Sequence, residues 1–428
     1  MRPNLLSAVI GIAIVIAVML LIELYAFKSI AVSLDNSAPL TRKLVIWGYW
    51  LLTAAVFALS ILAMVNFRQW RSDHPTLLMV SMAAFMVIGA PKLVLASFHL
   101  LDDLRLGFQW VGSKLMTSGV SASTDLADTG TKISRSTFIT RVGYVGAGLT
   151  FASFLYGVTL GKYKFRVLDH SVPLAKLPGG FAGWKVVQIS DAHLGSFLND
   201  REPIEKSIEL INSLDPDLIL FTGDLVNVEA SEAEPWIDVF AKLKARHGKF
   251  SILGNHDYAD YGAMTDEQRA ASRKRIIEIH REMGFDLLMN ENRILESNGD
   301  RMALVGVENW GKGFKQQGDL PKALRGTENL DCRILLSHDP THWEEQVLGK
   351  ELGIQLTLSG HTHGMQMGIE IPAIGLKLSP ARLRYRRWGG LYTEGIQHLH
   401  VNRGFGFIGF PGRVGMPPEI TLLNLQQA

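Results

Sequence analysis

Five short segments between Asp191 and His363 carry the Asp, Asn and His side chains that bind divalent cations. In chain order they are Asp191-Ala192-His193, Gly223-Asp224, Gly254-Asn255-His256-Asp257, Ser337-His338-Asp339 and Gly360-His361-Thr362-His363. Two divalent cations that share one carboxylate need about seven protein ligands, and roughly 3.5–4 Å between them suits a clamp on the attacking and leaving oxygens of a phosphate ester. These residues therefore predict hydrolysis of a phosphate bond.

The ligand types narrow the choice of metal. Oxygen and imidazole ligands without thiolate suit Mn, Fe, Zn, Co or Mg, and the mixture favours a transition metal. The chain has one cysteine, Cys332, which excludes an intrachain disulfide and a cysteine-based zinc site. Cys332 stands in an apolar run and is expected to be buried. Asn255 offers a neutral oxygen, which leaves the neighbouring His256 free to face a substrate.

The elements that must position these residues alternate between strand-like runs and helical patterns from residue 162 onward. The expected strands, each ending just before a ligand segment, are Trp184–Ile189, Leu218–Phe221, Phe250–Leu253, Ile334–Leu336 and Ile354–Leu358. Amphipathic helices are expected over Ile204–Ile211, Trp236–Leu243 and Asp266–Met283, and further strands over Ile396–Leu425. This alternation predicts an α/β domain with ligands at the carboxyl ends of its strands.

The whole series resembles the calcineurin-like metallophosphoesterase superfamily, over Lys185 to Leu425. The resemblance implies a four-layer α/β/β/α sandwich, with two mixed sheets inside and helices outside. It implies a metal-bound hydroxide as nucleophile, His256 as the group that contacts the phosphate and protonates the leaving oxygen, and Asp257 as the residue that orients His256. The implied metal ligands are Asp191, His193 and His363 for the first ion, Asp224 as the bridge, and Asn255, His338 and His361 for the second.

Within that superfamily the chain is most similar to the membrane-attached bacterial branch of YkuE- and YaeI-type phosphoesterases. The similarity lies in Ser190–Gly195, Gly360–Gln366, Asn402–Gly406 and Pro417–Ile420. It implies a substrate such as a lipid-linked pyrophosphate, UDP-diacylglucosamine being one, although a phosphodiester or a phosphomonoester also fits the residues. Met365 stands where a second glycine is common, which affects the expected shape of the pocket and not metal binding.

The first 161 residues are of another kind. Four apolar stretches of about the 20 residues that a bilayer helix needs lie at Leu5–Phe27, Leu44–Phe67, Leu77–Leu101 and Phe138–Gly161. They predict an all-α transmembrane region of about four helices over residues 1–161, ahead of a catalytic domain over residues 162–428. A soluble helical bundle is the alternative, as is a cleaved signal peptide for the first stretch, but no small-residue cleavage site follows Phe27. We therefore expect a multi-pass protein of the bacterial cell membrane that contacts membrane lipids.

Charge limits the partners. Lys plus Arg is 43 and Asp plus Glu is 41, so nucleic-acid binding is not expected. With four spans, one side holds six basic residues and the other eight, which by the positive-inside rule slightly favours a catalytic domain outside the cytoplasm. The six are Arg2, Arg68, Arg71, Lys162, Lys164 and Arg166, and the eight are Lys28, Arg42, Lys43, Arg105, Lys114, Lys132, Arg135 and Arg141.

Three further features have two interpretations each. Glu23 and Lys92 lie within or near the spans; we expect a helix end for Glu23 and a kink or span boundary at Pro91-Lys92, with a role in transport or lipid handling as the alternative. Arg403 and Arg413 suit either an anion or a structural role. The basic run with Arg382, Arg384, Arg386 and Arg387 is a solvated loop or a contact for anionic headgroups.

Two functions of different classes fit these observations. The first is a membrane-anchored, metal-dependent phosphoric ester hydrolase. The second is a transporter, sensor or scaffold whose phosphoesterase-like domain only binds a ligand. The complete ligand set favours the enzyme, because a binding domain has no need to keep His256 beside Asn255.

Overall fold

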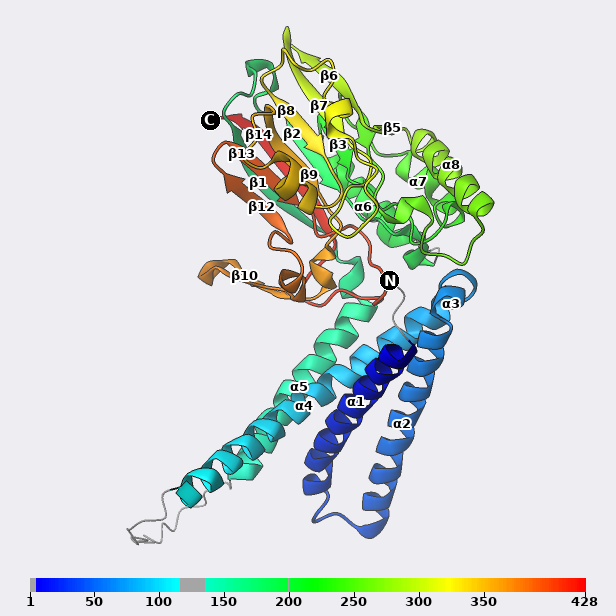
Figure 1. Ribbon diagram of the computed structural model, residues 1–428, viewed down its shortest axis with the longest axis vertical. Helices are drawn as coiled ribbons and strands as arrows, with labels where there is room; N and C mark the ends of the chain where they lie inside the picture. The colour runs from blue at the N-terminus through cyan, green and yellow to red at the C-terminus, as the bar shows by residue number, and fades with distance from the viewer. Residues whose placement is uncertain (1–4, 116–134, 199) are drawn as a thin grey trace. The chain divides into compact units, whose positions relative to one another are not determined.

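The computed structural model describes residues 5–115, 135–198 and 200–428, so Arg2 and Lys132 lie outside the described residues. Contacts divide the chain into two compact units (Figure 1). A helical unit contains residues 1–62 and 81–155, and a catalytic unit contains residues 63–80 and 156–428. The segment 63–80 therefore belongs with the catalytic unit, although its two ends fall within two of the apolar stretches of the sequence.

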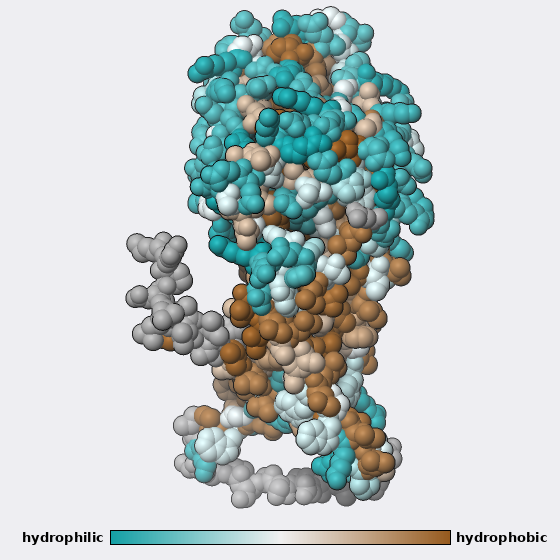
Figure 2. Space-filling model, turned by 90° about the vertical axis from the view of Figure 1, so that its right-hand side faces the viewer, coloured by the Kyte–Doolittle hydropathy of each residue, from teal (hydrophilic) through white to brown (hydrophobic). Residues whose placement is uncertain are grey.

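The predicted transmembrane region of about four helices is confirmed. Its long helices are α1 (Leu5–Ser33), α2 (Pro39–Val65), α4 (Pro75–Leu115) and α5 (Arg135–Thr159). Among the described residues four helices are long and apolar enough to cross a membrane. Large apolar side chains such as Trp47 and Leu51 are exposed on them, and hydrophobic residues cover much of the helical surface (Figure 2). Such a surface suits lipid as its solvent.

A buried ion pair joins three of these helices. Nζ of Lys92 on α4 lies 2.8 Å from Oε2 of Glu23 on α1, and both side chains are almost completely buried. Tyr49 and Thr53 on α2 donate to the same carboxylate at 2.6 and 3.1 Å. The helix α1 runs on to Ser33, so the expected helix end at Glu23 is wrong. The helix α4 continues through Pro91, so no span boundary falls at Pro91-Lys92, and the two charges neutralise each other inside the unit.

The catalytic unit contains two six-stranded mixed sheets and one two-stranded hairpin. The first sheet has the order β1 (Arg166–Leu174), β14 (Glu419–Gln427), β2 (Lys185–Ile189), β3 (Leu218–Phe221), β4 (Lys249–Ser251), β5 (Asp286–Leu287). The second has the order β12 (Gly390–Glu394), β13 (Gln397–Val401), β9 (Ile354–Ser359), β8 (Arg333–Leu336), β7 (Asp300–Gly306), β6 (Glu291–Ser297). The hairpin pairs β10 (Ile369–Ile371) with β11 (Leu376–Leu378).

Hydrophobic cores on both faces of each sheet produce the four layers. The central core fills the space between the sheets, with Val186 and Leu220 from one sheet and Leu304 and Leu336 from the other. An outer core packs α6 (Arg201–Ser213), α7 (Ile237–Phe240) and α8 (Asp266–Glu282) on the first sheet. Another packs α9 (Leu320–Ala323) and Trp343 on the second. The predicted α/β/β/α sandwich is confirmed, and the central strands β2, β3, β8 and β9 are buried nearly throughout because both of their faces are covered.

Local sequence sets most of the element bounds. The strand Leu218–Phe221 is found as predicted, and α8 begins after the capping box of Thr265 and Gln268 and is followed by Gly284 at φ +82°. The helix expected over Trp236–Leu243 is shorter, since only Ile237–Phe240 is α-helical. Cys332 is fully buried, as predicted.

Candidate metal centre

All the predicted ligand segments lie in the loops that directly follow strands. In the first sheet, the loop after β2 carries Asp191 and His193, the loop after β3 carries Asp224, and the loop after β4 carries Asn255. In the second sheet, the loop after β8 carries His338, and the loop after β9 carries His361 and His363. The carboxyl ends of these parallel strands meet at one edge of the sandwich, where open α/β sheets place their sites.

The backbone at the site is held in an uncommon conformation. Five of the seven predicted ligands have positive φ: Asp191, His193, Asp224, His361 and His363, at 45° to 70°. Non-glycine residues rarely adopt this region, and such outliers gather at functional sites. Close backbone approach supports it, since a Cβ on Gly360 would collide with the Asp191 carboxylate and one on Gly254 with the Asp224 carboxylate.

The first cluster consists of Asp191, His193 and His363, whose ligand atoms all lie within 4.8 Å of one another. Nε2 of His193 lies 3.1 Å from Nε2 of His363, which lies 3.2 Å from Oδ1 of Asp191. Nδ1 of His193 lies 3.1 Å from the carbonyl oxygen of Val226, so Nδ1–H donates there. Nε2 then directs its lone pair into the cluster, which is the orientation of a metal-binding histidine.

The second cluster consists of Asp224, His338 and His361, also within 4.8 Å. Nε2 of His338 lies 3.1 Å from Oδ2 of Asp224 and 3.2 Å from Nδ1 of His361. Nδ1 of His338 donates to the carbonyl oxygen of Thr222 at 2.7 Å. Oδ1 of Asn255 is buried without a hydrogen-bond partner among the described residues, while its amide nitrogen donates to Tyr261 at 2.9 Å. An amide oxygen left unpaired in this way fits a metal ligand.

Asp224 connects the two clusters. Its Oδ2 lies 3.1 Å from Nε2 of His338 and 3.6 Å from Nε2 of His193, which belong to different clusters. This is the position that a bridging carboxylate requires. The residues present therefore fit two divalent cations, with seven oxygen and nitrogen donors and no thiolate.

Electrostatics at the site favour positive charge. Burial lowers the pKa of His338, but Asp224 and Asp191 outweigh burial and raise it to about 10. Burial alone would raise the pKa of Asp224, but the surrounding histidines, His338 foremost, hold it well below its usual range. The carboxylates thus attract a proton or a cation strongly at this position.

His256 lies beside the clusters. Its backbone N–H donates to Oδ1 of Asp224 at 2.7 Å, and its Nδ1 lies 2.6 Å from the carbonyl oxygen of Asn227. The ring stacks on Tyr261 at a centroid distance of 4.3 Å. Burial lowers the pKa of His256 to about 4, with Arg71 adding to the decrease.

Asp257 accepts backbone hydrogen bonds from the loops on either side of the site. Its carboxylate accepts hydrogen bonds from the backbone N–H groups of Asp224, Leu225 and Gly254 at 2.8–2.9 Å. These hydrogen bonds fasten the loop of Asn255 and His256 to the loop of Asp224. The orientation of His256 by Asp257 stays a prediction, and this geometry supports an indirect form of it.

Other polar residues near the site have structural partners. Arg403 pairs with Glu419 at 2.6 Å and Glu370 at 2.7 Å. Arg413 is fully buried and donates to the carbonyl oxygens of Arg403, Gly404 and Gly406. These contacts favour the structural interpretation of both arginines.

The basic run is not uniformly solvated. Arg387 is buried and pairs with Glu344 at 2.7 Å and Glu394 at 2.6 Å, whereas Arg382 and Arg386 are exposed. Between these two residues in the chain, Tyr385 brings its hydroxyl to 2.8 Å from Nε2 of His361. Tyr385 was not among the predicted site residues, because its spacing from the ligand segments carries no signal.

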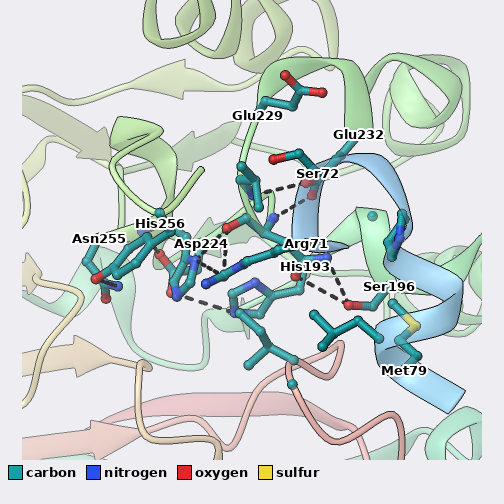
Figure 3. Close-up of a pocket in the computed structure, with 18 of the residues that line it drawn as sticks. Arg71, Ser72, Met79, His193, Ser196, Asp224, Glu229, Glu232, Asn255 and His256 are labelled. Carbon is teal, nitrogen blue, oxygen red and sulfur yellow. Dashed lines mark hydrogen bonds and ion pairs between the residues drawn. The ribbon is translucent and has the colours of Figure 1, made fainter. Parts of the chain in front are cut away.

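A pocket of about 470 Å³ opens onto both clusters within the catalytic unit (Figure 3). His193, Asp224, Asn255, His256, His361 and His363 line one part of it. The segment 63–80 lines another part, through Phe67, Arg71, Ser72, Pro75, Leu78 and Met79. No motif pointed to this segment, and Arg71 entered the sequence analysis only as one basic residue of a loop.

The fold and the site define a membrane-attached metallophosphoesterase. Residues 185–365 match the family described as calcineurin-like phosphoesterase, and residues 6–162 match one described as probable calcineurin-like phosphoesterase, transmembrane domain. The chain belongs to the calcineurin-like metallophosphoesterase family and is a phosphoester hydrolase.

Three relatives illustrate the range of the family. The chain is 30% identical over 306 residues to the uncharacterized metallophosphoesterase YkuE of Bacillus subtilis, with 69% of this chain and 98% of that one covered. It is 26% identical to the transmembrane protein with metallophosphoesterase domain of Bos taurus, with 96% of this chain and 88% of that one covered. The match to the protein of the same description from Danio rerio spans 62% of that protein.

Proposed function

We propose that this hydrolase uses two divalent cations to cleave a phosphate ester or pyrophosphate bond in a phospholipid or lipid-linked nucleotide. The single observation that carries the dinuclear assignment is the position of Asp224 between the two clusters. Asp191, His193 and His363 would hold one cation, and Asn255, His338 and His361 the other. Bound there, the cations would supply Lewis-acid activation of the phosphate and of the attacking water.

The protein's own groups supply positioning and proton transfer. His256 is held by its backbone bond to Asp224 and by the carbonyl oxygen of Asn227, so its Nε2 is the ring nitrogen left for the substrate. A phosphate next to the imidazole raises the pKa of His256, because negative charge favours the protonated form. His256 then donates a proton to the leaving oxygen.

A lipid-linked substrate follows from the membrane spans together with the pocket. Four spans exceed what a simple tether needs, and the wall of the pocket includes Pro75, Leu78 and Met79 from the first turns of one candidate span. An apolar group next to the phosphate would bury its surface against these side chains, at roughly 25 cal/mol per Å² of apolar area.

The test uses purified full-length protein in lipid nanodiscs with Mn²⁺. We would compare bis(p-nitrophenyl) phosphate, a phospholipid and a lipid-linked nucleotide pyrophosphate in the same preparation. We expect hydrolysis of phosphate esters in this preparation, with the largest kcat/KM for a lipid-linked substrate. Absence of hydrolysis of every phosphate ester by metal-loaded protein would overturn the proposal, and equal kcat/KM for soluble and lipid-linked substrates would overturn its lipid part.

We also propose that the catalytic unit lies outside the cytoplasm. The side of the membrane opposite the catalytic unit carries eight basic residues and its own side carries six, and the more basic side is expected to face the cytoplasm. Cys332 is the only cysteine and is buried, so single introduced cysteines report orientation cleanly. A membrane-impermeant maleimide applied to intact cells should label Glu296→Cys in the catalytic unit and leave Asn36→Cys, between α1 and α2, unlabelled. The reverse pattern would place the catalytic unit in the cytoplasm.

A further inference from the structure

The short helix α3 (Phe67–Asp73) brings one positive charge into the pocket. It follows α2 directly and belongs to the segment 63–80 of the catalytic unit. Figure 3 shows the side chain of Arg71 reaching toward His256, among residues of both the segment and the metal centre. Arg68 lies on the same helix and is exposed.

One nitrogen of Arg71 makes all of its hydrogen-bond contacts in the described part of the chain. Nη2 donates to the carbonyl oxygen of Asn227 at 3.0 Å and lies 3.2 Å from Nδ1 of His256. That carbonyl oxygen has two lone pairs and accepts from both Arg71 and His256. The guanidinium also lies over the ring of Tyr261, 5.3 Å from its centroid.

Arg71 has no carboxylate within ion-pair distance in the part of the chain that the structure describes. Burial lowers its pKa, and Glu232 opposes this from a greater distance. The carboxylate of Glu232 already accepts the backbone N–H groups of Asn227 and Val228 at 2.6 and 3.0 Å. A half-buried guanidinium with unused donors is costly unless an anion joins it, and its fork of N–H groups matches phosphate oxygens.

We propose that Arg71 binds a phosphate oxygen of the substrate, so that residues 67–79 complete the active site with a phosphate-binding group and an apolar wall. The phosphate would lie between the metal centre and Arg71, beside His256. The group attached to it would contact Phe67, Leu78 and Met79. The inference rests on the proposed function, and it specifies which part of the chain recognises each part of the substrate.

The experiment compares Arg71→Gln, Arg71→Lys and the matched control Arg68→Gln in the full-length protein. The probe is inorganic phosphate, measured as a competitive inhibitor and by the thermal shift that it causes. A charged hydrogen bond to an anion is lost in Arg71→Gln, so we expect its inhibition constant to rise about 10–100-fold. Arg71→Lys keeps a point charge and should lose less, and Arg68→Gln should match the unmodified protein.

A purely structural role of Arg71 predicts a different result. The variant would then show a lower melting temperature or metal content, with an unchanged affinity for phosphate. Unchanged phosphate inhibition and unchanged kcat/KM in Arg71→Gln overturn the proposal while leaving the proposed function intact. If the unmodified, metal-loaded protein hydrolyses no phosphate ester, the proposed function itself is refuted.

The apolar wall has its own readout. Phosphate esters with alkyl groups of increasing length should show a KM that falls with length in the unmodified protein. In Met79→Ser this fall should be smaller, while inhibition by inorganic phosphate stays unchanged. The same dependence on length in Met79→Ser and the unmodified protein would remove this segment from the substrate site.

Discussion

Nε2 of His193 lies 3.1 Å from Nε2 of His363. Nδ1 of His193 donates to Val226, and burial lowers the pKa of His193 well below its usual range, so its Nε2 is an unprotonated acceptor. At this distance the two nitrogens either share a proton in a hydrogen bond or share a cation. A cation bound by Asp191, His193 and His363 would take the place of that proton.

Metal removal is therefore expected to lower stability as well as activity. A ligand at 100 times its Kd stabilises the folded state by about 2.7 kcal/mol. After chelation and desalting, the melting temperature should fall and hydrolysis should stop, and Mn²⁺ should restore both. A metal-free preparation, verified by elemental analysis, with an unchanged melting temperature would contradict this expectation.

Asp224→Asn should weaken both cation sites at once, because its Oδ2 faces both clusters. We expect a loss of activity greater than the roughly 10–100-fold typical of residues that only support a ligand. Elemental analysis should find fewer than two metals per chain, and circular dichroism should be unchanged. The control Asp331→Asn, at an exposed carboxylate, should behave as the unmodified protein. Two bound metals and normal turnover in Asp224→Asn would refute the bridge.

His256→Ala should reduce the rate while keeping the metals. The backbone N–H that donates to Asp224 is retained in this variant, whereas the proton donor is lost. General acids contribute about 10²–10⁴-fold. The defect should be smallest for p-nitrophenyl esters, whose leaving group needs no proton, and largest for alkyl esters. If the variant loses metal and its dependence on leaving group is unchanged, His256 is a ligand.

Arg413→Lys should destabilise the loop of residues 402–418. The guanidinium donates to several carbonyl oxygens there, and an ammonium group cannot reach all of them. Each buried carbonyl left unpaired costs about 1–3 kcal/mol. The melting temperature should fall, whereas the exposed control Arg382→Lys should not change it. A stable Arg413→Lys with weaker phosphate inhibition would favour the alternative, an anion-binding role.

His280 should make the protein sensitive to acid. It is buried without a hydrogen-bond partner among the described residues, between Phe221 and Phe285, and burial lowers its pKa to about 3. Its unfolded pKa is about 6.5. The unfolded state therefore binds the proton first, and stability is lost as pH falls below 6.5, by up to about 1.4 kcal/mol per pH unit.

The variant His280→Leu removes this dependence. The melting-temperature difference between His280→Leu and the unmodified protein should grow as pH falls from 7 to 5. The exposed control Arg281→Gln, on the same helix, should follow the unmodified protein at each pH. A constant difference across this range would show that His280 does not titrate on unfolding.

The sequence by itself determined the class of the fold and the candidate ligands. Apolar runs such as Leu218–Phe221 have the length of buried strands, and each is followed by residues with oxygen or imidazole ligands. Strand ends and ligand types are local properties, so they could be read without the structure. The four apolar stretches could also be predicted from the sequence, because a bilayer fixes the length of a helix that crosses it.

Only the tertiary structure decided which distant groups meet. Arg71 and His256 are 185 positions apart, and Glu23 and Lys92 are 69 apart. No periodicity or spacing links such pairs, because their approach depends on how helices and sheets pack and not on local conformation. A boundary drawn at residue 161 from composition would also separate Arg71 from the site, whereas the contacts assign residues 63–80 to the catalytic unit.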